Sequence, residues 1–342
     1  MQPHAPLYHM PAEWSPLDAV WLTPPHNPET WPGCFDEACA QYEQFQRTLA
    51  EHVTVRTTAE LDIPTNDSWI RDFGPIFVTL RTRPETRDPR TAALPPLAAH
   101  DFRFNGWGGK YETRDLDDDA PVPIAAHLGI PLFRHDLVLE GGSIEVNGAG
   151  TLLTTEQCLL NPNRNPDKTR EQIEAEVHAA LGTRHTIWLP GGIVGDDTDG
   201  HIDDLARFVS PTHVVAVRAA SADHPDFDVL ERNWAALLLA RDQDGRPLQL
   251  TPLPAPQPIH YHFPPNRFGP GGVNPVPASY ANFLFANDAV LVPIFNQPTD
   301  DAALRTLESV LPRHRVIGVR ADRLVVGLGA FHCLSQQQPR AV

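Results

Sequence analysis

The C-terminal part of the chain contains the stretch Gly327-Leu328-Gly329-Ala330-Phe331-His332-Cys333-Leu334-Ser335-Gln336-Gln337-Gln338-Pro339. The apolar run 324–328 leads into it and predicts a buried strand, and residues 336–339 predict a polar loop. Gly327 and Gly329 permit a tight turn or a close approach of the backbone. A thiol that follows a core strand stands where catalytic nucleophiles often lie. A buried, inert cysteine fits this stretch equally well, so the rest of the chain has to decide.

The segment 66–75 has five polar or charged residues within seven positions, beside Trp69 and before a Gly-Pro break. A solvated turn does not require a tryptophan, and a core strand does not hold Asp72 next to Arg71. An ordinary ion pair of Arg71 with one of the two aspartates is the alternative, and such pairs are common. We interpret the segment as part of a site.

Two further apolar runs end in ionisable residues. Glu140 follows residues 137–139 and precedes two glycines, and a carboxylate buried there is unfavourable unless it is hydrogen-bonded or used. The segment 196–204 holds five carboxylates and a histidine within nine residues. In a strand-like conformation His201 and Asp203 face the same way, which suits a metal site or acid–base chemistry.

These residues are regularly spaced. Gaps of 68, 61 and 132 residues separate Asp72, Glu140, His201 and Cys333. Five units of about 68 residues, each with two or three strands and a helix, account for nearly the whole chain. The fifth slot falls near residue 267, inside the Pro-rich segment 250–277, which predicts a long structureless lid or binding loop. We therefore expect a cyclic array of β-rich units whose strand ends converge on one site.

The composition bounds the fold and the partners. The chain has 342 residues, 41% of them hydrophobic, with 36 prolines and 22 glycines, which favours β or α/β architecture with short elements. Its net charge of −16 repels phosphate backbones and makes nucleic acid an unexpected partner. The same charge attracts a cationic small molecule, although solubility alone also explains it.

The cysteines and the hydropathy indicate a compartment. The four cysteines form no CxxC pair, and a chain of this length is no disulfide scaffold. Cys34 and Cys158 are expected to pack as small hydrophobic residues, and Cys39 to lie on a helix. No apolar run approaches the roughly 20 residues that cross a bilayer, and residues 1–10 lack the features of a signal peptide. We expect a reduced, cytoplasmic protein with no membrane partner.

A thiol, a histidine and the carboxylates of Asp72, Glu140 and Asp203 form the candidate site. A thiol attacks as its anion, and its unperturbed pKa is about 8.5. Carboxylates around one pocket repel each other unless the pocket receives a positive charge. A guanidinium group matches paired carboxylates in two-point fashion. The set therefore predicts attack of a thiolate on the central carbon of a bound guanidinium.

Seven segments, distributed over almost the whole chain, carry a family resemblance: 10–14, 66–75, 104–109, 139–143, 161–166, 200–203 and 332–339. In this order they resemble the agmatine deiminase and bacterial peptidylarginine deiminase family, part of the guanidino-group-modifying pentein superfamily. The resemblance implies an α/β fold, a five-bladed β/α propeller with pseudo-fivefold symmetry, in a single catalytic domain over residues 1–342. It implies no metal and no organic cofactor.

The resemblance also implies roles for the residues. Cys333 attacks the guanidinium carbon, and Asp72 and Asp203 hold the guanidinium nitrogens. His201 passes protons to departing ammonia and from the attacking water. Glu140 hydrogen-bonds in this network and orients His201 or the substrate.

Three more residues are expected to line the pocket by resemblance: Trp69, Trp107 and Asp197. Asp197 is the candidate partner of a distal ammonium, whereas from the residues alone Trp107 fits a core position equally well. Many family members have Gly-Gly-Asn where this chain has residues 328–330, so the reaction type is implied more firmly than the substrate.

The expected function is a hydrolase of linear amidines that converts agmatine and water into N-carbamoylputrescine and ammonia, a step of putrescine biosynthesis. Deimination of arginine in peptides, or of another small guanidine, is the alternative with the same chemistry. A metal-dependent amidohydrolase using His201 and Asp203 and a non-catalytic binder of a cationic ligand are the other classes. Assembly into a homo-oligomer and movement of the segment 250–277 stay open.

Overall fold

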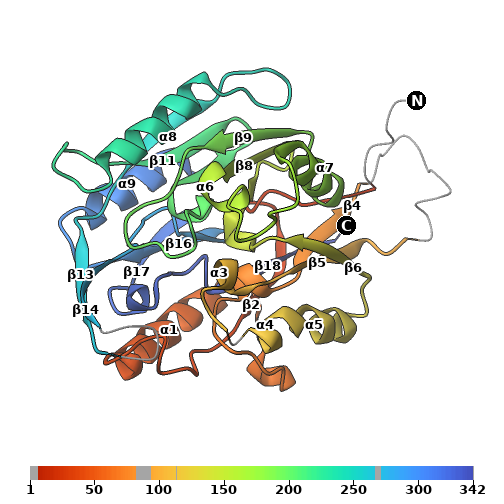
Figure 1. The fold of residues 1–342 in the computed structure, drawn as a ribbon, viewed down its shortest axis with the longest axis horizontal. Helices are drawn as coiled ribbons and strands as arrows, with labels where there is room; N and C mark the ends of the chain where they lie inside the picture. Colours follow the sequence, from red (N-terminus) through yellow and green to blue (C-terminus); the bar gives the residue numbers. More distant parts are fainter. Residues whose placement is uncertain (1–6, 82–93, 113, 266–270, 342) are drawn as a thin grey trace.

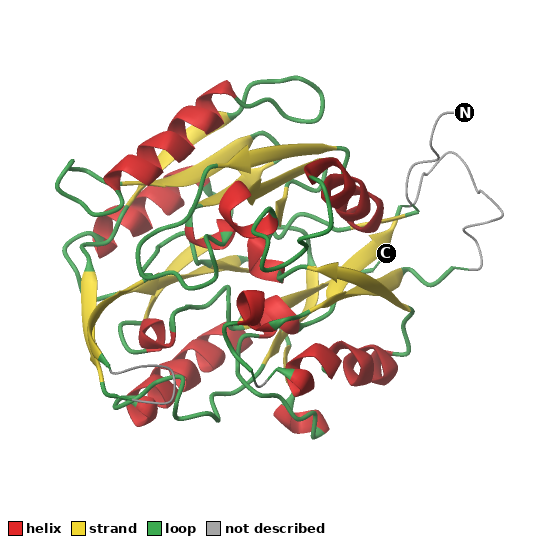
Figure 2. Ribbon diagram, in the orientation of Figure 1, coloured by secondary structure: helices red, strands yellow, loops and turns green. Residues whose placement is uncertain are grey.

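The computed structural model describes residues 7–81, 94–112, 114–265 and 271–341 of the chain. Helices and strands alternate through it, which confirms the expected α/β class (Figure 2). The helices are α1 (Phe35–Ala50), α2 (Ile70–Phe73), α3 (Gly106–Gly109), α4 (Asp115–Asp119), α5 (Pro121–Leu128), α6 (Glu156–Leu159), α7 (Arg170–Leu181), α8 (Phe227–Leu239) and α9 (Asp300–Val310), with the 3₁₀ helices η1 (Ala59–Leu61), η2 (Gly141–Ser143), η3 (Ile202–Asp204) and η4 (Leu324–Gly327).

The strands are β1 (Tyr8–His9), β2 (Leu17–Leu22), β3 (Val55–Thr57), β4 (Ile76–Leu80), β5 (Leu97–Arg103), β6 (Leu132–Val138), β7 (Glu145–Val146), β8 (Thr151–Thr155), β9 (His185–Leu189), β10 (Ala206–Ser210), β11 (His213–Arg218), β12 (Gln249–Pro254), β13 (Ile259–Phe263), β14 (Gly272–Val276), β15 (Leu284–Ala286), β16 (Ala289–Ile294), β17 (Arg315–Arg320) and β18 (Ser335–Pro339). They form six sheets within the described residues, one of which is the isolated hairpin β13-β14.

The other five sheets share one pairing pattern. In β4-β5-β6, β7-β8-β9, β10-β11-β12, β15-β16-β17 and β18-β2-β3 the first two strands are antiparallel and the last two are parallel. A connection that contains at least one helix joins each parallel pair, as parallel strands require. The unit of strands plus a helix that the residue spacing predicts is therefore present. One unit joins the two ends of the chain, because β18 pairs with β2.

The longer helices cover the outside of these sheets. In Figure 1, α1 and α5 lie along one side of the molecule and α7 and α8 along the opposite side, with the strands between them. Helix α1 buries Ala38, Tyr42, Phe45 and Leu49, whose spacing of three or four positions gives one apolar stripe. Within the described ranges, no helix combines the length and the apolar character needed to cross a bilayer.

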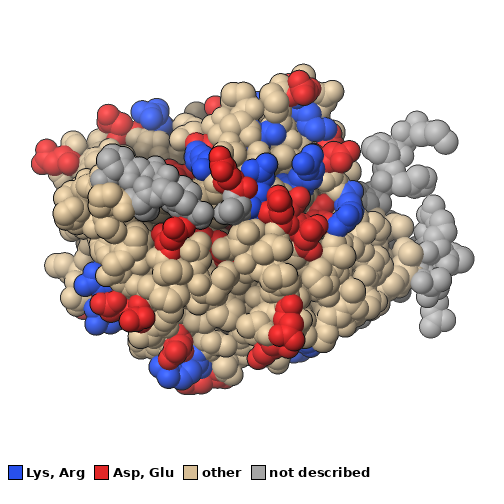
Figure 3. Space-filling view, turned by 60° about the horizontal axis from the view of Figure 1, so that its bottom comes forward, with Lys and Arg blue, Asp and Glu red and all other residues tan. Residues whose placement is uncertain are grey.

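Charged side chains are intermingled on the surface. On the face drawn in Figure 3, Lys and Arg side chains lie among Asp and Glu side chains, and the described residues of that face form no continuous field of one sign. The net charge of −16 is therefore not displayed there as a single acidic surface.

Two expectations for the C-terminal stretch are wrong. Residues 324–328 are not a strand, because Leu324–Gly327 form η4 and Leu328 has a left-handed backbone with φ 73°. A short apolar run that is buried on all sides has the same composition in either conformation. Residues 336–339 are not a polar loop, because they belong to the buried strand β18.

Buried glutamines make this polar strand possible. The amide of Gln336 donates to the carbonyl of Pro75 at 2.8 Å, and the indole of Trp21 donates to Gln338 Oε1 at 3.0 Å. Hydrogen-bonded polar groups are tolerated in a core. These partners are more than 250 residues away in the sequence, so a local pattern could not reveal the strand.

One more local expectation differs from the structure, because the strand-like conformation expected for residues 201–203 is instead the start of η3. Residues 158–160 begin within the short helix α6, which Thr155 caps by accepting from the backbone N–H of Cys158 at 3.2 Å. The acidic residues 115–119 form helix α4, and the buried Asp117 accepts the backbone N–H of Asn66 at 2.7 Å.

The Pro-rich segment 250–277 is not structureless. It contains most of β12 and all of β13 and β14, while residue 267 lies outside the described residues. Strand β14 tolerates Pro275 because a two-stranded hairpin has free edges, where a missing N–H breaks no ladder.

The aromatic pair Phe45 and Phe331 ties α1 to the segment before Cys333. Their rings stack with centroids 4.3 Å apart and an interplanar angle of 2°, and both side chains are fully buried. We expect Phe45→Ala to lower the free energy of unfolding by about 3–5 kcal/mol through lost burial and a residual cavity. Urea denaturation followed by circular dichroism measures this change.

The control is Leu239→Ala on α8, because that side chain is 80% exposed and surface truncations stay within about 0.5 kcal/mol. Equal stabilities of the two variants would contradict a structural role for the stacked pair.

Candidate active site

The five repeated units each contribute a polar side chain from the same place, just before the first strand of the unit. These residues are Asp72 before β4, Glu140 before β7, Asp203 before β10, Asn282 before β15 and Cys333 before β18, and all are buried. Strand ends are rigid supports, and positioning on such elements holds a site more accurately than free loops do. Asn282 is the member that the sequence analysis missed.

One cavity of about 510 Å³ gathers most of the predicted site residues. Its lining includes six of the eight: Trp69, Asp72, Trp107, Asp197, His201 and Cys333. Asp203 and Glu140 are fully buried behind this wall. The hairpin β13-β14 contributes Phe263 and Asn274 to the lining, so the Pro-rich segment does border the cavity.

The thiol of Cys333 lies among acids. Asn282 Nδ2 donates to Sγ at 3.0 Å, and Sγ lies 3.5 Å from Asp203 Oδ2. Burial raises the pKa of Cys333 well above that of an ordinary thiol, and the nearby carboxylates of Asp203, Asp204 and Asp72 raise it further, while Asn282 lowers it in part. In the unliganded protein the sulfur is therefore protonated.

Asp72 is held on two sides. Its Oδ2 accepts from the indole of Trp107 at 2.9 Å, and its Oδ1 accepts from the backbone N–H of Gly142 at 2.9 Å. Burial raises the pKa of Asp72 to about 6, against the lowering effect of His201. Trp107 thus lines the cavity and orients a carboxylate, and it is also a buried core residue. Both positions expected for this residue therefore apply.

Gly142 marks the point where three side chains meet. A Cβ atom there would lie 2.5 Å from His201 Nδ1, 2.7 Å from Asp72 Oδ1 and 3.2 Å from Asp203 Oδ2. Such contacts are too short for any side chain, so the position has to be glycine. The convergence brings together His201, Asp72 and Asp203, as the sequence predicts.

His201 faces the cavity as a cation. Its Nδ1 lies 3.6 Å from Asp72 Oδ1. Burial lowers the pKa of His201, but the Asp72 carboxylate, the Cys158 thiol and Asp203 together raise it well above the usual value. The imidazole therefore carries a proton that it can give to a leaving group.

Glu140 is paired with an arginine that the motif analysis did not single out. Arg164 Nε donates to Glu140 Oε1 at 3.0 Å, and Arg164 Nη2 donates to the carbonyl of Thr198 at 2.8 Å. The same guanidinium contacts Asp199. Glu140 therefore anchors, through Arg164, the loop that leads to His201.

A network of buried charged side chains stabilises the carboxylate of Asp203. His332 Nδ1 lies 2.7 Å from Asp203 Oδ2, and His332 Nε2 lies 2.7 Å from Glu13 Oε1. Arg207 also pairs with Glu13, and Arg71 Nη1 lies 3.4 Å from Glu13 Oε1. Burial raises the pKa of Asp203, but His332, His201 and Arg207 lower it below its usual value. Asp203 thus stays ionised without any ligand.

The sequence analysis missed the roles of His332 and Glu13. The available signal was the segment 10–14, whose glutamate lies in a family-like motif near the start of the chain. The alternative reading, an ion pair of Arg71 with one of the two nearby aspartates, is wrong in its partner, because Arg71 pairs with Glu13.

The outer part of the cavity is acidic as well. Asp197 Oδ2 accepts from the hydroxyl of Tyr111, and burial raises the pKa of Asp197. Burial likewise raises the pKa of Asp67, to about 6, and both carboxyl groups line the cavity. A cation bound there would be stabilised in its charged form.

Trp69 walls the cavity beside the thiol. A Cβ atom on Gly329 would lie 2.6 Å from Trp69 Cζ3 and 3.0 Å from Cys333 Cβ. The glycine therefore lets the indole pack against the segment that carries the nucleophile candidate, which is the close approach that the sequence predicts.

An α/β fold that gathers a thiol, an imidazole and several carboxylates around one cavity defines an enzyme site. The family model for Porphyromonas-type peptidyl-arginine deiminase matches residues 9–339, and the chain belongs to this family.

Individual relatives match over almost their full length. The agmatine deiminase of Medicago truncatula is 36% identical over 369 residues, covering 97% of this chain and 96% of the relative. The agmatine deiminase of Stutzerimonas stutzeri is 36% identical over 364 residues, covering 97% and 95%. The solved structure of the agmatine deiminase of Enterococcus faecalis has a TM-score of 0.88 at 28% identity, covering 98% of this chain and 97% of that one.

Because of the acids around Cys333, we expect its thiol to be alkylated slowly in the free protein. Because its pKa is raised, we expect the rate of Cys333 alkylation by iodoacetamide to rise with pH, with a midpoint above the ordinary thiol value of about 8.5. Asp204→Asn removes one of the charges that raise this pKa and should move the midpoint to lower pH. Peptide mass spectrometry at several pH values measures the rate at Cys333 alone.

Asp228→Asn is the matched control, because Asp228 is exposed on α8. A midpoint at or below the ordinary value in the unmodified chain would contradict the electrostatic description of the site.

Proposed function

We propose that this chain deiminates agmatine, converting agmatine and water into N-carbamoylputrescine and ammonia. The observation that carries the proposal is a buried thiol that lines one cavity together with several carboxylates and the imidazole of His201. Such a cavity is electrostatically incomplete until a flat cation enters it. Relatives named as agmatine deiminases match the chain over almost its whole length.

Binding of the guanidinium is assigned to two carboxylates. Asp72 lines the cavity, and Asp203 Oδ1 has no hydrogen-bond partner among the described residues although it is buried. Each can accept N–H groups from the substrate in charge-assisted hydrogen bonds. The added positive charge lowers the pKa of Cys333, because it offsets the carboxylates that raise it.

The covalent steps follow from the same residues. The thiolate of Cys333 attacks the guanidinium carbon, and the carbon–nitrogen bond to one terminal nitrogen breaks. The proton lost by the thiol goes to solvent, and His201 gives its own proton to the departing ammonia. A water molecule then attacks the resulting thiouronium carbon while His201 accepts its proton, and the carbon–sulfur bond breaks to release the carbamoyl product. Glu140 fixes the loop that carries His201.

The outer carboxylates favour agmatine over arginine. Agmatine ends in an ammonium, whereas free arginine has a carboxylate at the same end of its alkyl chain. Asp197 and Asp67 line the outer cavity and would attract the first group and repel the second. Arginine within a peptide lacks this charge and is the second candidate, favoured by the family model that matches the chain.

The spatial arrangement of the five repeated units is also part of the proposal. We propose that the five sheets with the common pairing pattern are the blades of a five-bladed β/α propeller with pseudo-fivefold symmetry, in one domain over residues 1–342. The equivalent origin of the five site residues supports this arrangement. A cytoplasmic location stays a prediction from the sequence, and assembly into a homo-oligomer stays open.

Ammonia release tests the substrate. We expect kcat/KM for agmatine to exceed that for free arginine and for an arginyl peptide, because of the acidic outer cavity, and Cys333→Ser to abolish release from agmatine. Cys39→Ser on α1 serves as the matched control. Turnover of the peptide without turnover of agmatine would show that peptidyl-arginine, and not agmatine, is the substrate. Full activity of Cys333→Ser would exclude a mechanism in which the thiol attacks the substrate.

Asp72→Asn tests the guanidinium contact. The variant leaves the positive charge of the substrate without one of its buried partners. We therefore expect kcat/KM for agmatine to fall by a factor that corresponds to a loss of about 3–5 kcal/mol of transition-state stabilisation. Steady-state kinetics at fixed pH measures the loss, with Asp228→Asn as the control. An unchanged kcat/KM would exclude Asp72 from the site.

A further inference from the structure

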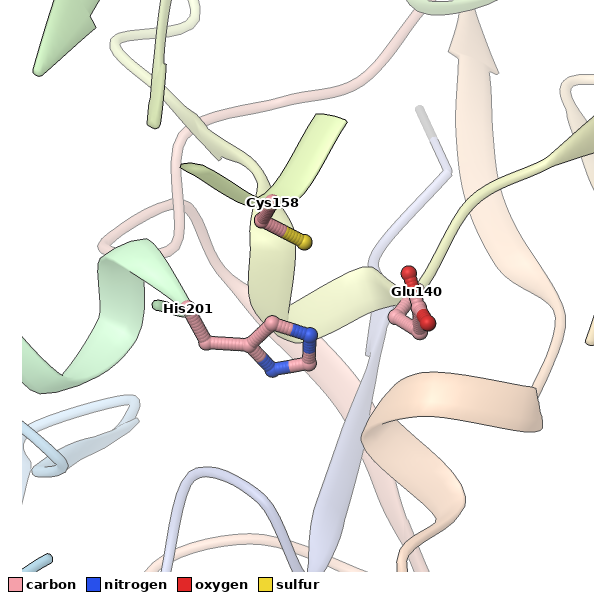
Figure 4. A group of neighbouring side chains, drawn as sticks. All are labelled: Glu140, Cys158 and His201. Atoms are coloured by element: carbon pink, nitrogen blue, oxygen red, sulfur yellow. The ribbon is translucent and has the colours of Figure 1, made fainter. Parts of the chain in front are cut away.

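A second set of reactive side chains lies behind His201. Glu140, Cys158 and His201 each offer a donor atom, and these atoms all lie within 4.8 Å of one another. In Figure 4 the sulfur of Cys158, the carboxylate of Glu140 and one ring nitrogen of His201 point toward a common space. All three residues are buried. The deimination chemistry described above does not use Cys158.

The nitrogen and oxygen donor atoms of this set that do not contact Arg164 form no hydrogen bonds within the described part of the chain, although His201 Nδ1 lies 3.6 Å from Asp72 Oδ1. Glu140 Oε2 and both ring nitrogens of His201 are buried and have no hydrogen-bond partner among the described residues. Glu140 keeps its other oxygen for Arg164. Unpartnered buried polar atoms are rare and call for an explanation.

A comparable set elsewhere in the core shows the difference. Glu13, Glu145 and His332 also bring three donor atoms together. There, both nitrogens of His332 are bonded to carboxylates, and Glu145 accepts from Arg207 and from the backbone of Phe208. The polar atoms of that set are used in hydrogen bonds and ion pairs. In the set around Cys158, Glu140 Oε2 and the ring nitrogens of His201 have no hydrogen-bond partner among the described residues.

We propose that Glu140, Cys158 and His201 bind a soft divalent cation of the Zn²⁺ and Cd²⁺ type, and that the bound ion switches the deiminase off. One thiolate, one imidazole and one carboxylate are typical ligands of such ions. Ligand atoms around tetrahedral Zn²⁺ lie about 3.3–3.8 Å apart, so only a small contraction of the present arrangement is needed.

His201 provides the route of entry and the link to activity. Of the three residues it is the one that lines the cavity, so an ion in the cavity meets the imidazole first. When the ion binds, the S–H bond of Cys158 and an N–H bond of the imidazolium break, a metal–sulfur and a metal–nitrogen bond form, and two protons go to solvent. A metal-bound His201 can no longer pass protons, so turnover stops while the guanidinium-binding carboxylates stay in place.

Binding is tested by ultraviolet absorption on the full-length, chelator-treated protein titrated with Cd²⁺. A sulfur-to-cadmium charge-transfer band should appear in the unmodified chain and in Cys333→Ser, and it should disappear in Cys158→Ser and in Cys158→Ala. Cys39→Ser is the matched control and should keep the band. Circular dichroism checks that each variant is folded.

Two outcomes would overturn the site. The first is the absence of a band in the unmodified chain, and the second is a band that is lost in Cys333→Ser but kept in both Cys158 variants. Because two different replacements are made at Cys158, loss of folding in one leaves the other as the test.

Inhibition is tested by ammonia release with added Zn²⁺, each protein being compared with its own metal-free rate. Losing one ligand should raise the Zn²⁺ concentration for half-inhibition at least about tenfold in Cys158→Ser. Equal sensitivity of the two proteins would refute the switch. This arm rests on the proposed deimination, whereas the absorption arm does not, so a failure of the proposed function leaves the metal site separately measurable.

Discussion

The structure depends on carboxylates that are gathered around one buried thiol. Burial raises the pKa of Asp72 to about 6 and raises that of Asp204 well above its usual value, and the same acids keep Cys333 protonated. Like charges at this spacing are unfavourable unless a cation offsets them. The cavity therefore favours a positive ligand, and in the proposed reaction the arrival of that ligand lowers the pKa of Cys333. Recognition and activation are in this way one electrostatic event, and a neutral analogue of the same shape would achieve neither.

A second, deeper set of charges gives the acids different properties. Arg207, His332 and Arg71 surround Glu13 and keep its pKa below the usual range despite complete burial. Asp203 contacts this network through His332 and has a pKa below its usual value, whereas the pKa of Asp72, which accepts from the neutral donors of Trp107 and Gly142, is raised to about 6. Removing one member of such a network leaves an uncompensated buried charge. The two acids assigned to the guanidinium therefore differ in acidity before a ligand enters.

The sequence predicted the parts of this site that are charged and follow apolar runs. Asp72, Glu140, His201 and Cys333 were found because an ionisable residue at the end of a buried run needs a reason, and their spacing gave the repeated unit of strands and a helix. Local patterns could not find Asn282, because an uncharged amide is unremarkable and the hairpin β13-β14 lengthens its unit, moving the fifth position from the expected 267 to 282.

Other features were hidden because distant parts of the chain create them. The glutamines of β18 are core residues only through partners such as Trp21 and Pro75, and Glu13 acquires its meaning from His332, 319 positions away. Short apolar runs such as Leu324–Gly327 allow either conformation until packing decides.

The placement of the nucleophile candidate has a consequence for how the site comes into being. Cys333 stands before β18, which pairs within its unit with β2 near the other end of the chain, and Arg71 donates to the carbonyl of His332 at 3.2 Å from a second unit. Asn282, the donor to the sulfur, comes from a third. No pair of neighbouring units can therefore reproduce the environment of the thiol. Contacts of such long sequence separation form late, after the entropy of closing the chain has been overcome, so the thiol meets its acids only when the two ends of the chain have joined.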